Sequence, residues 1–373
     1  MKGIYVDLID LAKEKTYIGV KKKIKGQIEG FKELNVNILN ISLENDYIML
    51  DDRKTNFKVK GNCGNFKRNK SFFDIISNNF EELILQYDFI YIRYTVCNIG
   101  MLNFIKKFNK YNKKIFIEIP TYPYDVEYDK NLKNLIILKL DKLILRMDTK
   151  NIYRIVLTNN MNKLYSSCSI NIFNGIRTKD IASSNFKKKL QNNRINIIAV
   201  ANISKWHGYD RVIYGLKDYY SQDNNEIEVY FYIVGDGSDK ENLESLTNKL
   251  KLNNYVKFLG LKYGNELDEI FSQMDIGASS LALFRAGGGH DPIKSKEYVA
   301  KGLPVLLGYS DRALLDSLPF VFRSPSDDSA VDISKLVIQY KEMQNKITKD
   351  DILNYAYNNL TWKIQMKKII DIL

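Results

Sequence analysis

The alternation of short apolar runs with longer stretches of helical periodicity constrains the fold of this chain most. Helical stretches at 22–34 and 101–112 separate runs rich in β-branched and aromatic residues, which occur at 3–9, 36–42, 89–95, 114–120 and 154–159. Strands that alternate with helices in this way predict a parallel sheet covered on both faces.

The same alternation begins again after residue 194, with apolar runs at 195–203, 229–235, 256–260 and 276–280. The stretch 182–194 is polar and has no periodicity, and a chain of 373 residues is long for a single core. We therefore expect two Rossmann-like, doubly wound α/β domains, at 1–185 and 195–360. A helix at 361–373 would cross back to the first domain. The carboxyl ends of the strands, where open α/β sheets bind ligands, should face a cleft between the domains.

The composition indicates a globular protein, with 45% hydrophobic and 27% charged residues. The longest apolar run, 134–145, contains lysines and an aspartate and is shorter than the roughly 20 residues of a membrane span. Asp7 and Asp10 occupy a region that would be apolar in a signal peptide, and the three cysteines do not have the spacing of a metal site. We expect a cytoplasmic protein.

The charge of the chain is distributed unevenly. Residues 1–194 contain 35 Lys and Arg against 20 Asp and Glu, whereas the remaining residues are slightly acidic. Such an excess is typical of contact with an anionic surface or substrate, and a lysine-rich solvated surface is the plainer interpretation. We expect peripheral contact with the inner face of the cell membrane and no nucleic-acid partner.

Two glycines follow the apolar run at 229–235. Gly235 and Gly237 stand between this strand and a helical stretch, where glycine lets the backbone approach a ligand closely. Glycine turns after strands are also common for structural reasons. The stretch is not a G-x-G-x-x-G fingerprint, so it does not favour a dinucleotide enzyme.

The stretch 287–305 carries the most specific pattern. Gly287, Gly288 and Gly289 can expose backbone amides, and Lys294 lies close enough in sequence to reach the same anion. Glu297 shares the helix face of Lys294, and a carboxylate beside a phosphate is suited to accept hydrogen bonds from a ribose. The pattern predicts a site for a nucleoside diphosphate. A capped helix with a surface Lys/Glu pair is the structural alternative.

A second cationic group follows the strand at 195–203 and contains Lys205, His207 and Arg211. The only other histidine, His290, lies within the glycine-rich stretch, and both histidines follow predicted strands. The carboxylates at 125, 127 and 129 lack the glycine and the later glutamate of a calcium loop, so we interpret them as a polar turn. We expect no metal site.

The sequence resembles retaining glycosyltransferases of the two-domain GT-B type, in particular the family-four class that builds bacterial polysaccharides. The resemblance is carried by "IIAVANIS" with "KWHGYDRVIYGL", by "YIVGDG" and "VKFLG", and by "PIKSKEYVAKGLPVL". It implies that Glu297 binds the ribose of the donor, that Lys294 contacts the diphosphate, and that the loop at Leu261 holds the base. It also implies a nucleotide-sugar donor, such as a UDP- or GDP-sugar, with no separate cofactor, and catalysis assigned to Lys294, Glu297 and His290.

Three positions depart from the class. Gly289 stands where the first of two glutamates is usual, Asn202 replaces an arginine, and His207 replaces a lysine. Acceptor-side candidates in the first half are Arg93, Glu118 and Asp125.

The leading hypothesis is therefore a metal-independent transferase that moves a sugar to a lipid-linked or glycan acceptor. A non-catalytic, glycosyltransferase-like partner subunit and a sugar-nucleotide epimerase are the alternatives, and fold alone does not separate them.

Overall fold

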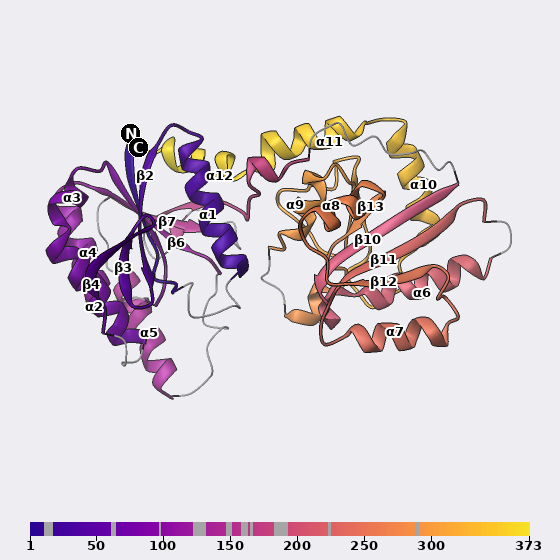
Figure 1. Cartoon of the computed structure of the whole chain (residues 1–373), viewed down its shortest axis with the longest axis horizontal. Coiled ribbons are helices and arrows are strands. Elements are labelled where there is room, and N and C mark those ends of the chain that lie inside the picture. The colour runs from indigo at the N-terminus through magenta and orange to yellow at the C-terminus, as the bar shows by residue number, and fades with distance from the viewer. Residues whose placement is uncertain are drawn as a thin grey trace. The chain divides into compact units, whose positions relative to one another are not determined.

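The computed structural model describes residues 1–10, 18–60, 65–96, 98–121, 132–146, 151–157, 163–164, 167–182, 193–222, 225–287 and 291–373. The chain divides into two compact units (Figure 1). The first unit combines Met1–Arg177 with Trp362–Leu373, and the second is Thr178–Thr361. The polar stretch 182–194 thus falls inside the second unit, and the C-terminal helix belongs to the first.

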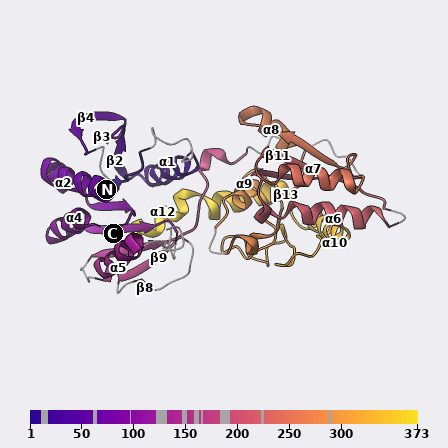
Figure 2. The ribbon, with the colours of Figure 1, turned by 90° about the horizontal axis from the view of Figure 1, so that it is seen from below.

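The first unit is built on a nine-stranded sheet in the order β4-β3-β2-β1-β5-β6-β7-β9-β8. Figure 2 shows β4 near one edge and β8 and β9 near the other. Its strands are β1 (Lys2–Val6), β2 (Asn37–Glu44), β3 (Tyr47–Leu50), β4 (Arg53–Lys58), β5 (Phe89–Arg93), β6 (Lys114–Ile119), β7 (Ile152–Val156), β8 (Lys163–Leu164) and β9 (Ser167–Asn171). Strands β3, β4 and β8 are antiparallel additions to a parallel centre.

The helices of the first unit cover both faces of this sheet. They are α1 (Ile18–Lys32), α2 (Asn65–Asn79), α3 (Glu81–Leu85), α4 (Ile99–Lys110), α5 (Leu132–Arg146) and α12 (Trp362–Ile370). Side chains alternate along each strand. In β1, Ile4 and Val6 therefore join a core with Phe72 of α2, while Tyr5 joins a second core with Trp362 of α12.

The second unit contains a six-stranded, fully parallel sheet in the order β12-β11-β10-β13-β14-β15. Its strands are β10 (Arg194–Asn202), β11 (Glu228–Asp236), β12 (Val256–Gly260), β13 (Ile276–Ala278), β14 (Val305–Leu307) and β15 (Val321–Arg323). Counted along the unit, this is the 3-2-1-4-5-6 order of the doubly wound Rossmann fold. The predicted fold class of two Rossmann-like α/β domains is confirmed.

Helices and short helical turns connect the strands of the second unit. They are η3 (Thr178–Asp180), η4 (Lys205–His207), α6 (Tyr209–Tyr220), α7 (Lys240–Lys249), α8 (Gly264–Ser272), η5 (Leu283–Ala286), α9 (Lys294–Ala300), α10 (Ile333–Gln344), α11 (Lys349–Tyr355) and the π-helical turn η6 (Ala356–Leu360).

Candidate functional site

The order of strands in the second unit reverses between β10 and β13. Ligands of open α/β sheets bind at the carboxyl ends of the strands at such a switch point. Two loops meet there, because the backbone N–H of Leu281 donates to the carbonyl of His207 over 2.8 Å. Gly208 has φ +64°, and a Cβ at this residue would lie 2.8 Å from the backbone nitrogen of Ala282. The loop after β10 can approach the loop after β13 so closely because residue 208 is glycine.

His207 and Lys294 are the predicted site residues that the structure brings into direct contact. Nε2 of His207 lies 2.6 Å from Nζ of Lys294, although 87 positions separate them in sequence. The backbone N–H of Ser204 donates to Nδ1 of His207 over 3.1 Å, which assigns the imidazole proton to Nε2. An Nε2–H group needs an acceptor, and the nitrogen of Lys294 accepts only as a neutral amine. The contact is therefore satisfied when both side chains are uncharged.

Burial disfavours the charged form of both side chains. Burial, with the nearby charge of Lys294 in second place, lowers the pKa of His207 to about 3. Burial also lowers the pKa of Lys294 to about 8, although the carboxylate of Glu297 acts in the opposite direction. His207 is thus neutral at physiological pH, and Lys294 takes up or releases a proton in a mildly alkaline range.

Glu297 lies one helical turn after Lys294 in α9 and is half-buried. The spacing of three residues places the two side chains on one face of α9. The position of α9 is fixed by Lys296, which is fully buried. This lysine donates to Asp291 over 2.6 Å and to Asp311 over 3.0 Å. Lys294 and Lys296 therefore differ in role. Lys294 lies at the candidate site, whereas Lys296 fixes the position of the helix. Sequence spacing did not reveal the role of Lys296, because Asp311 lies on a later loop.

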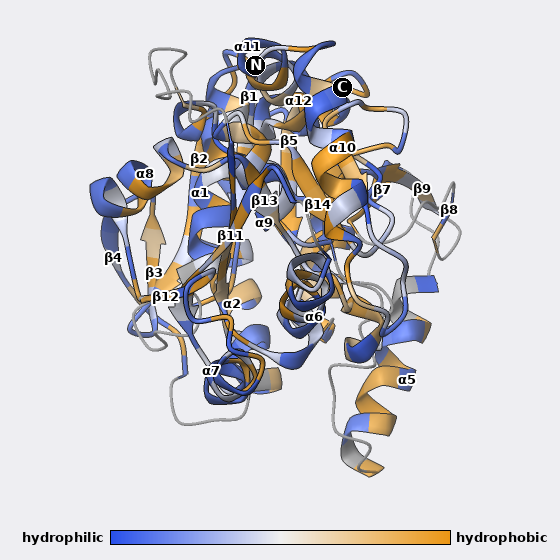
Figure 3. Cartoon of the chain, turned by 90° about the vertical axis from the view of Figure 1, so that its right-hand side faces the viewer, coloured by the Kyte–Doolittle hydropathy of each residue, from blue (hydrophilic) through white to orange (hydrophobic). Residues whose placement is uncertain are grey.

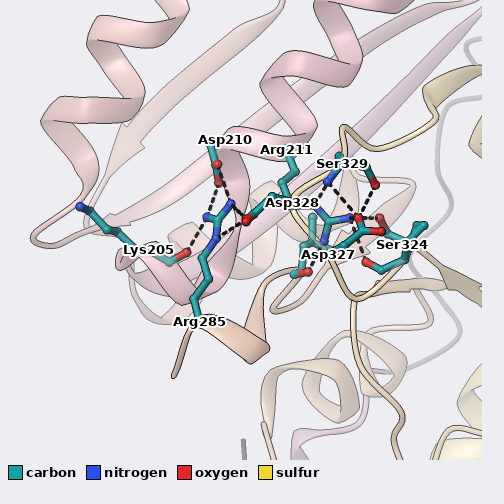
Figure 4. Close-up of polar contacts among 10 residues, drawn as sticks. Lys205, Asp210, Arg211, Arg285, Ser324, Asp327, Asp328 and Ser329 are labelled. Atoms are coloured by element: carbon teal, nitrogen blue, oxygen red, sulfur yellow. Dashed lines mark hydrogen bonds and ion pairs between the residues drawn. The ribbon is translucent and has the colours of Figure 1, made fainter. Parts of the chain in front are cut away.

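Arg211 does not present its charge to a ligand, contrary to our interpretation of the sequence. The side chain is fully buried, and its Nε donates to the carbonyl of Ser329 over 2.7 Å (Figure 4). One terminal nitrogen donates to Ser324 Oγ at 2.7 Å and to the carbonyl of Pro325 at 2.9 Å, and the other donates to the carbonyl of Leu281. Because each nitrogen of the guanidinium group has an acceptor, Arg211 stabilises the surrounding loops.

Arg285 takes a comparable role at the surface, in the short turn before Gly287. It donates to Asp210 over 2.9 Å and to Asp328 over 2.6 Å (Figure 4). It also donates to the carbonyl oxygen of Lys205 at 3.0 Å. The side chain of Lys205 is exposed and points away from this cluster in Figure 4. Lys205 thus contributes a backbone carbonyl here, and its ammonium group does not join the pair of His207 and Lys294.

Gly235 and Gly237 have a structural reason to be glycine. Their φ angles are +128° and +152°, and a Cβ would lie 1.9 Å from the carbonyl oxygen of Ala201 and 2.2 Å from that of Ile203, respectively. These glycines therefore let β11 end against the loop that follows β10. Gly287 has φ +81°, and a Cβ at this residue would meet no described atom within 4 Å. Leu261 follows β12 and is 58% exposed.

Several predicted residues fall outside the part of the chain that the structure describes: Gly288, Gly289, His290 and the carboxylates at 125, 127 and 129. Among the described residues, no group of His, Cys, Asp and Glu side chains is arranged to hold a metal ion.

The first unit has its own switch point, between β1 and β5. Arg93, at the end of β5, donates to Glu118 over 2.6 Å. Glu118 also accepts from Tyr91 at 2.7 Å and from Gln27 at 2.8 Å. Burial is the largest effect and acts to raise the pKa of Glu118, but the charges of Arg93 and Lys23 and the hydrogen bonds from Tyr91 and Gln27 together hold it below its usual value. Arg93 and Glu118, which we considered as acceptor-side candidates, thus satisfy each other inside the unit.

Asp7 lies beside this network, directly after β1, and sequence reasoning did not single it out. The side chain is fully buried. Oδ1 accepts from the backbone N–H of Ile9 over 3.3 Å, and within the described residues Oδ2 has no hydrogen-bond partner. Burial raises the pKa of Asp7 to about 7, although Ile9 and the charge of Arg93 act in the opposite direction. A carboxyl group that loses its proton near neutral pH therefore stands at the switch point of the first sheet.

The two Rossmann-like units have the fold of GT-B glycosyltransferases. Residues 180–349, which lie almost wholly in the second unit, match the family model described as glycosyl transferases group 1.

Solved structures support the same fold over the whole chain. The chain resembles a glycosyltransferase from Rickettsia africae at a TM-score of 0.64 and 14% identity, covering 100% of this chain and 97% of that one. It resembles Anabaena Alr3699/HepE in complex with UDP at a TM-score of 0.61 and 13% identity, covering 100% of both chains. A sucrose-phosphate synthase from Thermosynechococcus elongatus has a TM-score of 0.60 and 12% identity, with 100% and 98% covered. No curated protein sequence matches the chain.

Proposed function

We propose that the protein transfers a sugar from a nucleotide-sugar donor, such as a UDP- or GDP-sugar, to a lipid-linked or glycan acceptor. In this proposal the anomeric configuration of the sugar is retained, no metal ion takes part, and the product belongs to a bacterial capsular, extracellular or surface polysaccharide. The reaction takes place in the cytoplasm, at the inner face of the cell membrane.

The observation that carries the proposal is the position of Lys294. Its nitrogen lies in a half-buried position at the switch point, next to a neutral His207 and one turn before Glu297. A diphosphate bound there would accept hydrogen bonds from the ammonium group of Lys294, and the carboxylate of Glu297 would accept hydrogen bonds from the ribose hydroxyls. Anabaena HepE has been solved with UDP and with UDP-glucose, which supports a nucleotide sugar as the donor class.

The chemical step follows from this arrangement. The bond between the anomeric carbon and the diphosphate oxygen breaks, and negative charge accumulates on the departing diphosphate. Lys294 would stabilise this charge more strongly in the transition state than in the bound donor. With retention, the acceptor oxygen attacks from the face that the leaving group vacates. The departing phosphate can then take the acceptor proton, and no dedicated base is required.

The test begins with a thermal-shift panel of UDP, GDP, ADP and their sugars. A nucleotide at about 100 times its dissociation constant should stabilise the protein by roughly 2.7 kcal/mol. Transfer, or slow donor hydrolysis, is then measured with Lys294→Ala and Glu297→Ala. Loss of a charge-assisted contact of about 2 to 3 kcal/mol should lower kcat about 30- to 150-fold in Lys294→Ala. Glu297→Ala should mainly raise KM for the donor.

Lys217→Ala is the matched control, because this exposed lysine of α6 carries the same charge away from the switch point. It should leave both constants unchanged. If the parent binds no nucleotide and Lys294→Ala has no effect in the cell, the protein is a non-catalytic partner subunit instead.

A further inference from the structure

Helix α5 exposes a continuous row of apolar side chains. The exposed fractions are 75% for Leu132, 46% for Leu135, 51% for Ile136, 52% for Leu140 and 58% for Leu143. Apart from the adjacent pair Leu135 and Ile136, successive members are three or four residues apart, which places all five on one face of the helix. Figure 3 colours much of α5 as hydrophobic, and Figure 1 shows it extending beyond the sheet of the first unit. Apolar faces of surface helices normally pack on the core, so this row is unusual.

The opposite face of α5 is already packed, so the helix cannot turn its apolar row inward without losing contacts. Leu138 is 7% exposed and belongs to the core that also contains Phe72 and Phe104. The carboxylate of Asp141 is fully buried and accepts a hydrogen bond from the hydroxyl group of Tyr94. The exposed row is therefore presented to a partner outside this unit.

Charge identifies the kind of partner. Lys139 lies within the apolar row and Arg146 at its end, and both side chains are exposed. The surplus of Lys and Arg over Asp and Glu is confined to residues 1–194. A protein partner would have to cover a lysine inside an apolar contact. At a bilayer, by contrast, long basic side chains extend to the phosphates while neighbouring apolar side chains enter the acyl region.

We propose that α5 lies in the interface of an anionic lipid bilayer, with Leu132, Leu135, Ile136, Leu140 and Leu143 in contact with the acyl chains. Lys139 and Arg146 contact the phosphates of anionic lipids. This inference deepens the membrane contact of the proposed function, on which it rests for the location of the acceptor, by naming the surface that binds. No helix among the described residues is long and apolar enough to cross a membrane, and an interfacial helix does not need to be.

Vesicle flotation tests the apolar row. The full-length protein is mixed with phosphatidylcholine vesicles that contain or lack phosphatidylglycerol, and the fraction that floats is measured against lipid concentration. The triple variant Ile136→Gln/Leu140→Gln/Leu143→Gln should bind the anionic vesicles at least about tenfold more weakly, because it removes most of the apolar area that would enter the bilayer. The matched control is Ile338→Gln on α10, which replaces an apolar residue that is also 58% exposed. It should float like the parent.

The same assay tests the charges. Lys139→Gln/Arg146→Gln should lose about fivefold in vesicle affinity per basic residue, and the parent should bind more weakly at high salt. Melting temperatures of all variants should match the parent, since the substituted side chains are exposed.

Three results would overturn the proposal. These are a parent that floats with neither kind of vesicle, an apolar triple variant that floats as well as the parent, and a parent dimer that the triple substitution converts to a monomer. The last result would assign the row to a second copy of this chain. UDP binding is measured on the same samples. Vesicle binding without UDP binding would support the proposed role of α5 and contradict the proposed transferase function.

Discussion

The contact between His207 and Lys294 shows how two ordinary residues set the protonation state of a binding site. The imidazole presents Nε2–H to a lysine nitrogen, which favours the neutral amine in the unliganded protein. A diphosphate favours the ammonium form. Under the proposed function, donor binding would therefore displace Lys294 from His207 and fix a proton on the lysine.

The first prediction concerns the pH dependence of UDP binding. Because the pKa of Lys294 is about 8, the ammonium form is lost as pH rises through this value. The affinity for UDP should be constant between about pH 6, where the terminal phosphate of UDP itself titrates, and pH 8, and should fall about tenfold per pH unit above pH 8. Lys294→Arg keeps its charge, so its affinity should remain flat to a higher pH. Isothermal titration in buffers with different ionisation enthalpies measures the proton uptake. Equal pH profiles for the parent and Lys294→Arg would contradict the assignment.

The second prediction concerns Asp7, whose carboxyl group is buried and has one oxygen without a hydrogen-bond partner among the described residues. Its pKa is raised in the folded protein from 3.8 to about 7, so the folded state holds the proton more tightly. The stabilisation is present below pH 4 and is lost as pH rises through 7. Asp7→Asn does not lose stability in this way, because an amide group does not titrate. Its stability relative to the parent should increase by roughly 1.4 kcal/mol per pH unit between pH 4 and 7 and then level off.

Chemical denaturation at pH 5, 6, 7 and 8 measures this difference. The control is Asp10→Asn, because Asp10 forms an ion pair with Arg68 at 2.7 Å. This variant should be less stable than the parent at neutral pH. If Asp7→Asn showed a constant difference across the series, the carboxyl group would not titrate in that range.

At the scale of single residues, sequence spacing predicted that Lys294 and Glu297 share one helix face, but it did not reveal that Arg211 is buried. The two groups differ in where their partners lie. Lys294 and Glu297 lie one turn apart on one helix, so their proximity follows from helical geometry. The partners of Arg211 lie 70 to 118 positions away, on loops whose meeting point only the tertiary structure defines. A buried arginine and an arginine at a ligand site look the same in sequence.

At the scale of elements, the strands of the parallel sheets could be predicted because they are buried on both faces and therefore read as apolar runs. The hairpin of β3 and β4 could not, since β4 (Arg53–Lys58) is mostly polar and lies at a sheet edge. Helix α5 was recognised only as an apolar run. Its hydrophobic residues occupy both the buried and the exposed face, so periodicity alone did not indicate which face meets the core.

The packing of α1 against α12 depends on two glycines whose role could not be predicted from the sequence. A Cβ at Gly30 would lie 2.7 Å from the backbone of Trp362, and one at Gly26 would lie 2.3 Å from its ring. The backbone N–H of Trp362 donates to the carbonyl of Ile176 over 2.8 Å. Two glycines four positions apart thus form a surface on α1 that accepts the last helix of the chain.

At the scale of the whole molecule, each unit has its own sheet and core, and the chain enters the second unit once and leaves it once. Each unit can therefore have its own free energy of unfolding. The site of Lys294 and Glu297 lies in the second unit, whereas Trp362 is buried in the core of the first, although it follows the second unit in sequence. A ligand and a core substitution can then be used to address the two units separately.

The third prediction is that calorimetry resolves two unfolding transitions that respond to different changes. UDP at about 100 times its dissociation constant should raise only the transition of the second unit, by a stabilisation of roughly 2.7 kcal/mol. Trp362→Ala should lower only the transition of the first unit, by about 3 to 5 kcal/mol, because it removes a fully buried indole between α12 and α1. Tyr357→Ala, on an exposed residue just before α12, is the control and should change neither. A single transition that UDP and Trp362→Ala shift together would show that the two units unfold as one cooperative body.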